Sequence, residues 1–126
     1  LISVLQIAQQ QKHGTLIVIG EPKIARKEAK RLCDYNRGIG IKPTNLYINS
    51  DAIHNITSID GAIIMDVNCI CYGIGIILDG KVVTMGNPAR GARFNSAINY
   101  VENCKKNNES IVAVVISEDE TVDFCY

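Results

Sequence analysis

The twenty residues from Ile59 to Leu78, IDGAIIMDVNCICYGIGIIL, decide the class of fold. Two apolar runs in this window flank a short polar turn at residues 66–68, which predicts antiparallel strands over 62–65 and 69–78. Asp60, Asp66 and Asn68 interrupt the window, and such side chains are costly in hydrocarbon. We therefore expect the core of a sheet here rather than a membrane span.

The flanking segments predict a single α/β domain. Apolar spacing of three and four residues predicts a first helix from Leu1 toward Gly14, and further helices over 24–35, from Ser50 or Asp51 to 56, and over 92–106. Gly14 is placed to end the first helix as a left-handed cap. Continuous apolar runs predict further strands over 15–19 and 111–116. Two more strands are expected after turns, over 81–85 and 121–126. Residues 38–44 and 86–91 contain turn-forming residues and are expected to be connectors.

The predicted helix over residues 24–35 has two different faces. One stripe carries Ile24, Ala25, Glu28, Ala29 and Leu32. The opposite side is basic, with Lys23, Arg26, Lys27, Lys30 and Arg31. No aromatic residues interleave these charges, so a solvated helix face is favoured over a nucleic-acid-binding patch.

The composition excludes several classes of protein. The chain has 126 residues, of which 47% are hydrophobic and 21% charged, and this balance excludes a disordered chain. Thirteen basic and thirteen acidic side chains leave no global field that would attract nucleic acid or an anionic membrane. The five cysteines form no metal-binding spacing, and their odd number does not suit a disulfide framework, so we expect buried thiols and a cytoplasmic location. The chain begins without Met in an amphipathic pattern, which favours a fragment of a longer protein.

Three loop segments attract attention as candidate chemistry. Asp60 precedes a very apolar run, where a carboxylate either binds a cation, accepts several hydrogen bonds or caps a turn. Gly91 begins a helix whose start carries Arg90 and Arg93, and guanidinium groups there can bind an anion together with the backbone amides, or can be ordinary surface arginines. A third loop, residues 117–119, follows a predicted strand. Residues 73–75, GIG, lack the third glycine of a dinucleotide fingerprint and are not followed by a helix.

With these motifs in view, the chain resembles the diadenylate cyclase (DAC) domain family, also called the DisA nucleotide-binding domain. The resemblance rests on GTLIVIG at residues 14–20, DGAII at 60–64, GARFNSA at 91–97 and VVISEDE at 114–120. Members of this family join two ATP molecules into cyclic di-AMP. The resemblance implies a mixed sheet flanked by helices, with the nucleotide across the strand ends.

The resemblance also implies roles for particular residues. Asp60 matches the aspartate that assists the attacking 3′-hydroxyl and holds Mg²⁺ or Mn²⁺. The implied nucleotide-binding residues are Gly61, Ala62, Ile76, Ile77, Arg90, Gly91, Arg93, Ser96, Ser117 and Glu118. For Ile76 and Ile77, core packing explains the apolar side chains equally well. The implied partners are ATP or cyclic di-AMP, a second copy of the chain, and domains fused outside this fragment.

The chain departs from the family pattern at three places. The family's Arg-His-Arg triplet is replaced by Arg93, Phe94 and Asn95, which removes one imidazole and one guanidinium from the phosphate grip. Ala92 stands where the family usually has a threonine, and Ile59 where many active members have a histidine. Each lost charged hydrogen bond costs on the order of 2 to 4 kcal/mol in the transition state.

Three functions remain open from the sequence. The retained Asp60 favours a working diadenylate cyclase, which is a nucleotidyltransferase. The altered triplet favours a sensor that binds ATP, cyclic di-AMP or a related nucleotide without turnover and signals to a fused domain. The third possibility is an interaction module that has lost its nucleotide pocket.

Overall fold

The apolar window folds as the predicted hairpin, with β3 (Ala62–Asp66) and β4 (Ile70–Ile76) paired antiparallel. Every residue of β3 is buried. Asp66 stabilises the turn between the two strands, because its Oδ1 accepts hydrogen bonds from the backbone amides of Asn68 and Ile70. The computed structural model that contains this hairpin describes residues 1–10, 14–80 and 91–126.

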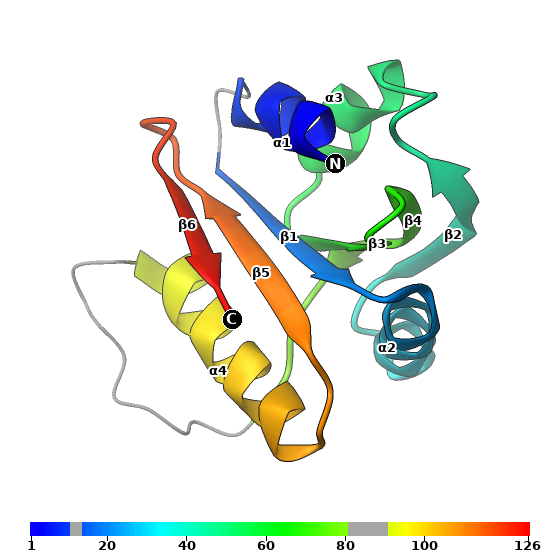
Figure 1. Cartoon of the computed structure of the whole chain (residues 1–126), viewed down its shortest axis with the longest axis vertical. Helices are drawn as coiled ribbons and strands as arrows, with labels where there is room; N and C mark the ends of the chain where they lie inside the picture. The colour runs from blue at the N-terminus through cyan, green and yellow to red at the C-terminus, as the bar shows by residue number, and fades with distance from the viewer. Residues whose placement is uncertain (11–13, 81–90) are drawn as a thin grey trace.

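The described residues form a six-stranded mixed sheet in the order β2-β4-β3-β1-β5-β6 (Figure 1). The remaining strands are β1 (Thr15–Gly20), β2 (Ile39–Asn45), β5 (Ile111–Ile116) and β6 (Val122–Cys125). β1 and β3 run parallel, and the other neighbouring pairs run antiparallel. The predicted α/β class with a mixed sheet is confirmed.

Helices cover both faces of the sheet. α2 (Pro22–Asp34) and α4 (Gly91–Lys106) pack on one face, and α1 (Ile2–Gln9) and α3 (Asp51–Thr57) lie together over the other (Figure 1). β1 serves both layers, because Leu16 and Val18 belong to the core under α2 and α4 while Ile17 and Ile19 face the opposite core. A strand covered on both faces is expected to be continuously apolar, and all six residues of β1 are buried.

Two predictions of local structure are wrong. Residues 38–44, expected to be a connector, instead contain most of the edge strand β2, which spans 39–45. Gly40 and Pro43 made this segment look like a connector, because both residues are common in turns. Proline is nevertheless tolerated on an edge strand, and here the pairing of β2 with β4 shifts register between Gly40 and Thr44. Gly14 does not cap the first helix, because α1 already ends at Gln9 with Gln10 as its C-cap.

Further predictions concern a membrane span, the cysteines and residues 81–91. Among the described residues, no helix is both long and apolar enough to cross a membrane. All five cysteines are free; Cys33 is half-buried and the other four are buried, in agreement with the expected thiols. The strand predicted over 81–85, most of the 86–91 loop and Arg90 lie outside the described residues.

Candidate functional site

The sheet topology brings the predicted motifs to one edge. β4 and β5 run antiparallel to β3 and β1, so the residues that end β4 and β5 lie beside those that begin β3 and β1. This edge carries Asp60 and Gly61 before β3, Ile77 after β4 and Ser117 after β5. The N-terminus of α4 approaches the same edge, since Arg93 lies against Gly14 at the start of β1.

A cavity of about 620 Å³ with several charged side chains in its lining lies at this edge, and we refer to it as the polar one. Its walls come from the segment before β3, the first turn of α4 and the loop after β5. The residues that line it are Asp60, Gly91, Ala92, Arg93, Val115, Ile116, Ser117, Glu118 and Asp119. The guanidinium of Arg93 and the helix N-terminus supply positive charge, while Asp60 and the 118–119 pair supply carboxylates.

A second cavity of about 320 Å³ is mainly apolar. It is lined by Leu16, Asp60, Gly61, Ala62, Gly75, Ile76, Ile77, Leu78, Ala92, Arg93 and Ser96. The two cavities share Asp60, Ala92 and Arg93. We call the two together the cleft. Its apolar part suits the face of a base, and its polar part suits phosphates and a cation.

Asp60 is positioned by a close approach of two glycines. Gly61 has φ of +109°, and a Cβ atom there would lie 2.7 Å from the carbonyl carbon of Gly75. Gly75 itself has φ of +58° and lies where the pairing between β3 and β4 shifts register. Residues 73–75, GIG, therefore form an irregular part of β4 against which the backbone of Gly61 packs. The side chain of Asp60, the residue before Gly61, is exposed at the cleft.

Arg93 occupies space that a side chain at Gly14 would fill. A Cβ atom at Gly14 would lie 2.6 Å from Nη1 of Arg93. Arg93 also stands in the first turn of α4, which contains no acidic residue. An arginine in the first turn of a helix opposes the helix dipole, so this placement is consistent with an anion at the same helix end.

The other two residues of the altered triplet are used elsewhere. Phe94 packs against the core under α2 and α4, and it lines a separate apolar pocket with Phe124 of β6. The Asn95 side chain donates a hydrogen bond of 2.9 Å to the carbonyl oxygen of Gly91. Within the described part of the chain, Arg93 is the one member of the triplet that lines the cleft.

The structure brings together every predicted site residue that it describes. The predicted Arg90 lies outside the described residues. Seven residues that line the cleft had no assigned role in the sequence analysis, although it did single out the loop over 117–119; they are Leu16, Gly75, Leu78, Ala92, Val115, Ile116 and Asp119. Gly75 had a visible signal, a second glycine two residues after Gly73 in an apolar strand, and such a glycine often marks a bulge or a close backbone approach.

The cleft has carboxylates suited to a hard divalent cation. Asp60, Glu118 and Asp119 line its polar part. Among the described residues, no cluster of three or more histidine, cysteine or acidic side chains is close enough to hold a metal by itself. Mg²⁺ is commonly bound by one or two carboxylates together with substrate phosphates, so Asp60 fits a metal that arrives with a nucleotide.

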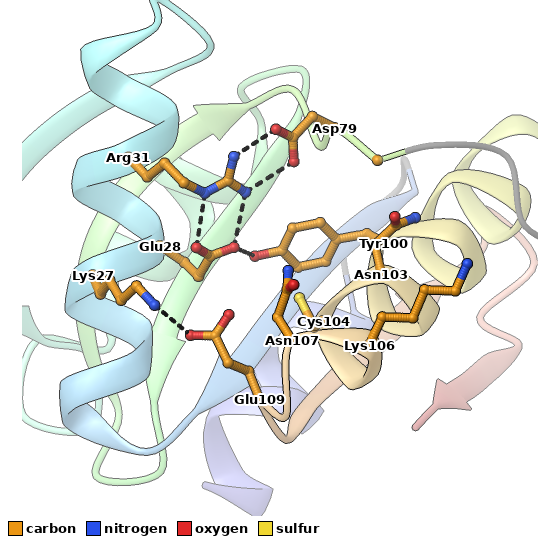
Figure 2. Close-up of a pocket in the computed structure, with 11 residues that line it drawn as sticks. Lys27, Glu28, Arg31, Asp79, Tyr100, Asn103, Cys104, Lys106, Asn107 and Glu109 are labelled. Carbon is orange, nitrogen blue, oxygen red and sulfur yellow. Dashed lines mark hydrogen bonds and ion pairs between the residues drawn. The ribbon is translucent and has the colours of Figure 1, made fainter.

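A further cavity, of about 910 Å³, lies between α2 and α4 and shares no residue with the cleft (Figure 2). Here Arg31 forms two hydrogen bonds with Glu28, of 2.9 Å each, and two with Asp79, of 2.6 and 2.9 Å. Tyr100 of α4 donates a 2.6 Å hydrogen bond to Oε1 of Glu28. Arg31 is therefore not part of a purely solvated helix face, contrary to the prediction. The signal for this network was Glu28, a carboxylate on an otherwise apolar stripe.

The network changes the proton affinity of its members. Burial raises the pKa of Glu28, but the hydrogen bonds from Arg31 and Tyr100 outweigh burial and hold this pKa below its ordinary 4.5. The hydrogen bonds from Arg31 lower the pKa of Asp79 below 3.8. Burial, followed by the hydrogen bond to Glu28, raises the pKa of Tyr100. At neutral pH the network therefore contains two carboxylates, one guanidinium and a protonated phenol.

Comparisons with known proteins agree with the fold and match the chain to one family. The family model described as DisA bacterial checkpoint controller nucleotide-binding matches residues 3–126. A crystal structure of a hypothetical membrane spanning protein from Bacillus cereus has a TM-score of 0.64 and 21% identity, and the match covers 98% of this chain and 56% of that one. A double mutant of DacA from Staphylococcus aureus has a TM-score of 0.63 and 18% identity, with 98% and 77% coverage. No curated protein matches the chain.

Proposed function

The chain belongs to the DAC family of DisA checkpoint-controller nucleotide-binding domains, and from that membership we propose that it binds ATP in the cleft and condenses two ATP molecules into cyclic di-AMP. The observation that carries this proposal is the shared position of Asp60 and Arg93 on both parts of the cleft. These two side chains carry opposite charges and are 33 residues apart in the sequence, yet both lie where the apolar part of the cleft adjoins its polar part. This arrangement suits adenine on one side and a triphosphate with its cation on the other.

The chemical step needs positioning and charge neutralisation more than covalent assistance. The 3′-oxygen of one ATP attacks the α-phosphorus of the other, an O–P bond forms, and the bond from the α-phosphorus to pyrophosphate breaks. Two such steps release two pyrophosphates and two protons. Asp60 accepts or orients the hydroxyl proton, and Arg93 stabilises negative charge on the phosphates, with Ser96, Ser117 and Glu118 along the same walls.

A divalent cation fits this arrangement. Mg²⁺ or Mn²⁺ held by Asp60 and the phosphates would neutralise negative charge on the oxygens of the reacting phosphate. Two domains must also face each other, because each supplies one ATP, so we propose that the active form is a homo-oligomer. We further propose that residues 1–126 are one nucleotide-binding domain of a longer cytoplasmic protein with additional domains. The chain spans 56% of the Bacillus cereus protein that it resembles.

A second candidate is a sensor that binds the nucleotide without turnover. It is favoured by Phe94 and Asn95, which take the places of the family's histidine and second arginine but do not line the cleft. Loss of two charged donors from the phosphate grip weakens transition-state stabilisation by on the order of 2 to 4 kcal/mol for each donor. Binding suffers less than catalysis, because the ground state carries less charge at the reacting atoms.

The experiment incubates the purified chain with ATP and Mn²⁺ or Mg²⁺ and measures cyclic di-AMP by mass spectrometry and ATP binding by calorimetry. For a cyclase we expect product that falls by about a hundredfold or more in Asp60→Asn. Asp34→Asn is the matched control, since Asp34 is an exposed carboxylate on α2 that pairs with Lys30. It should leave product formation unchanged.

Other results would point elsewhere. ATP binding without product, at any protein concentration, would favour the sensor. Absence of binding to both ATP and cyclic di-AMP with either metal would contradict both candidates and leave an interaction module.

A further inference from the structure

The chain that follows β4 is held by arginine side chains rather than by a neighbouring strand. β4 ends at Ile76, and residues 77–79 continue beyond the pairing with β2 and β3. Arg37 donates hydrogen bonds of 2.8 Å from Nε to the carbonyl oxygen of Ile77 and from Nη2 to that of Leu78. The backbone amide of Ile77 donates in return to the carbonyl oxygen of Arg37, at 2.8 Å.

The next residue, Asp79, is held by a second arginine. Its two carboxylate oxygens accept from Nη1 and Nη2 of Arg31 (Figure 2). Arg31 is fixed in turn by Glu28, which is only 3% exposed and also accepts from Tyr100. Three consecutive residues after β4 are thus attached to α2 and the turn that follows it, through the side chains of Arg31 and Arg37.

The same segment forms one wall of the cleft. Ile76, Ile77 and Leu78 line its apolar part, opposite Ala92 and Ser96 of α4. Ile77 is 59% exposed, so core packing does not fix its position. The polar part of the cleft is built from α4 and the loop after β5 and contains none of residues 76–79.

We propose that Arg31 and Arg37 are positioning residues that hold the base-binding wall of the cleft, so that their loss weakens recognition of the base while phosphate binding is retained. This inference rests on the proposed function, because it takes the apolar part of the cleft as the base site. Guanidinium groups suit this task, since their planar fork binds two carbonyl oxygens or one carboxylate with fixed geometry.

The test compares ATP with inorganic triphosphate, each with Mg²⁺, in calorimetric titrations of the unaltered chain, Arg37→Ala and Asp79→Asn. Arg31 itself is left in place, because its removal would leave the buried carboxylate of Glu28 without its charged partner. We expect each variant to bind ATP about tenfold more weakly, because each loses charged hydrogen bonds that hold residues 77–79. Binding of triphosphate should change by less than about twofold. Lys30→Gln is the control, since Lys30 is an exposed cation of α2 paired with Asp34, and it should bind both ligands normally.

Hydrogen exchange of the ligand-free variants gives an independent readout. We expect faster exchange at the amide of Ile77 and its neighbours, with unchanged exchange in the centre of β1. Equal losses of ATP and triphosphate affinity would overturn the inference, because the arginines would then act on the whole fold. Unchanged ATP affinity in both variants would overturn it while the proposed function stands. An unaltered chain that binds no ATP would contradict the proposed function, and the base wall with it.

Discussion

At the scale of single residues, two glycines lie where another part of the chain occupies the space that a side chain would take. Gly14 leaves room for the guanidinium of Arg93, and Gly61 lies directly against the backbone of Gly75. Both glycines adjoin the cleft and help to set the positions of its two charged residues. The contact with Gly75 explains on steric grounds why a glycine follows Asp60, and this contact could not be predicted from the sequence alone.

Gly61→Ala tests this steric reason. We expect the substitution to lower the free energy of unfolding by about 2 to 3 kcal/mol, because it combines positive φ with a collision against Gly75. Gly91→Ala is the matched control, since Gly91 has φ of +84° and nothing within 4 Å of the added Cβ atom. Urea denaturation measures both variants. Equal losses of stability would mean that backbone strain, rather than the contact with Gly75, explains the glycine.

At the scale of the secondary-structure elements, polar side chains on apolar helix stripes join one helix to another. Glu28 lies on the buried stripe of α2, and Tyr100 lies on the buried face of α4. Their hydrogen bond crosses between the two helices that cover the same face of the sheet (Figure 2). A buried carboxylate is costly without partners, so this contact and Arg31 together make its burial possible.

Tyr100→Phe removes this hydrogen bond and leaves the aromatic ring in place. We expect a loss of about 1.5 to 3 kcal/mol in the free energy of unfolding, because a buried charged acceptor loses one donor. Tyr47→Phe is the control, because Tyr47 is 65% exposed and its hydroxyl can bond to water. It should change stability by less than about 0.5 kcal/mol. A similar loss in both variants, measured by urea denaturation, would contradict a specific role for the contact with Glu28.

At the scale of the whole molecule, the network around Arg31 predicts how stability depends on pH. Asp79 and Glu28 have pKa values below their ordinary 3.8 and 4.5 in the folded chain. Below about pH 4.5 the unfolded chain takes up protons that the folded chain does not, so acid favours unfolding. The stabilisation is fully present above that pH and is lost as the pH falls through the lower folded values.

Thermal unfolding at a series of pH values from 7 to 3 measures this dependence. Asp79→Asn removes one of the two carboxylates, so we expect its Tm to fall less steeply below pH 4.5 than that of the unaltered chain. Parallel curves for the two proteins would show that Asp79 makes no contribution to the acid sensitivity.

The sequence predicted most of the elements because their apolar patterns are local. The continuous run of residues 15–19, the hairpin around Asp66 and the amphipathic helix over 92–106 each follow from short-range spacing, and all three are present. The edge strand β2 was missed because Gly40 and Pro43 resemble connector residues. An edge strand has one free side and fewer sequence requirements.

The sequence by itself determined the layered α/β class, through hydrophobic periodicity, and the chemical types available to the site, through the motifs at Asp60, Arg93 and Ser117. The tertiary structure alone decided that these residues share one cleft, because antiparallel pairing brings strand ends from distant parts of the chain to one edge of the sheet. It also decided that Phe94 packs against the core and that Arg31 and Arg37 bind the residues that follow β4. Such contacts depend on which surfaces meet after folding, and no local pattern along the chain specifies them.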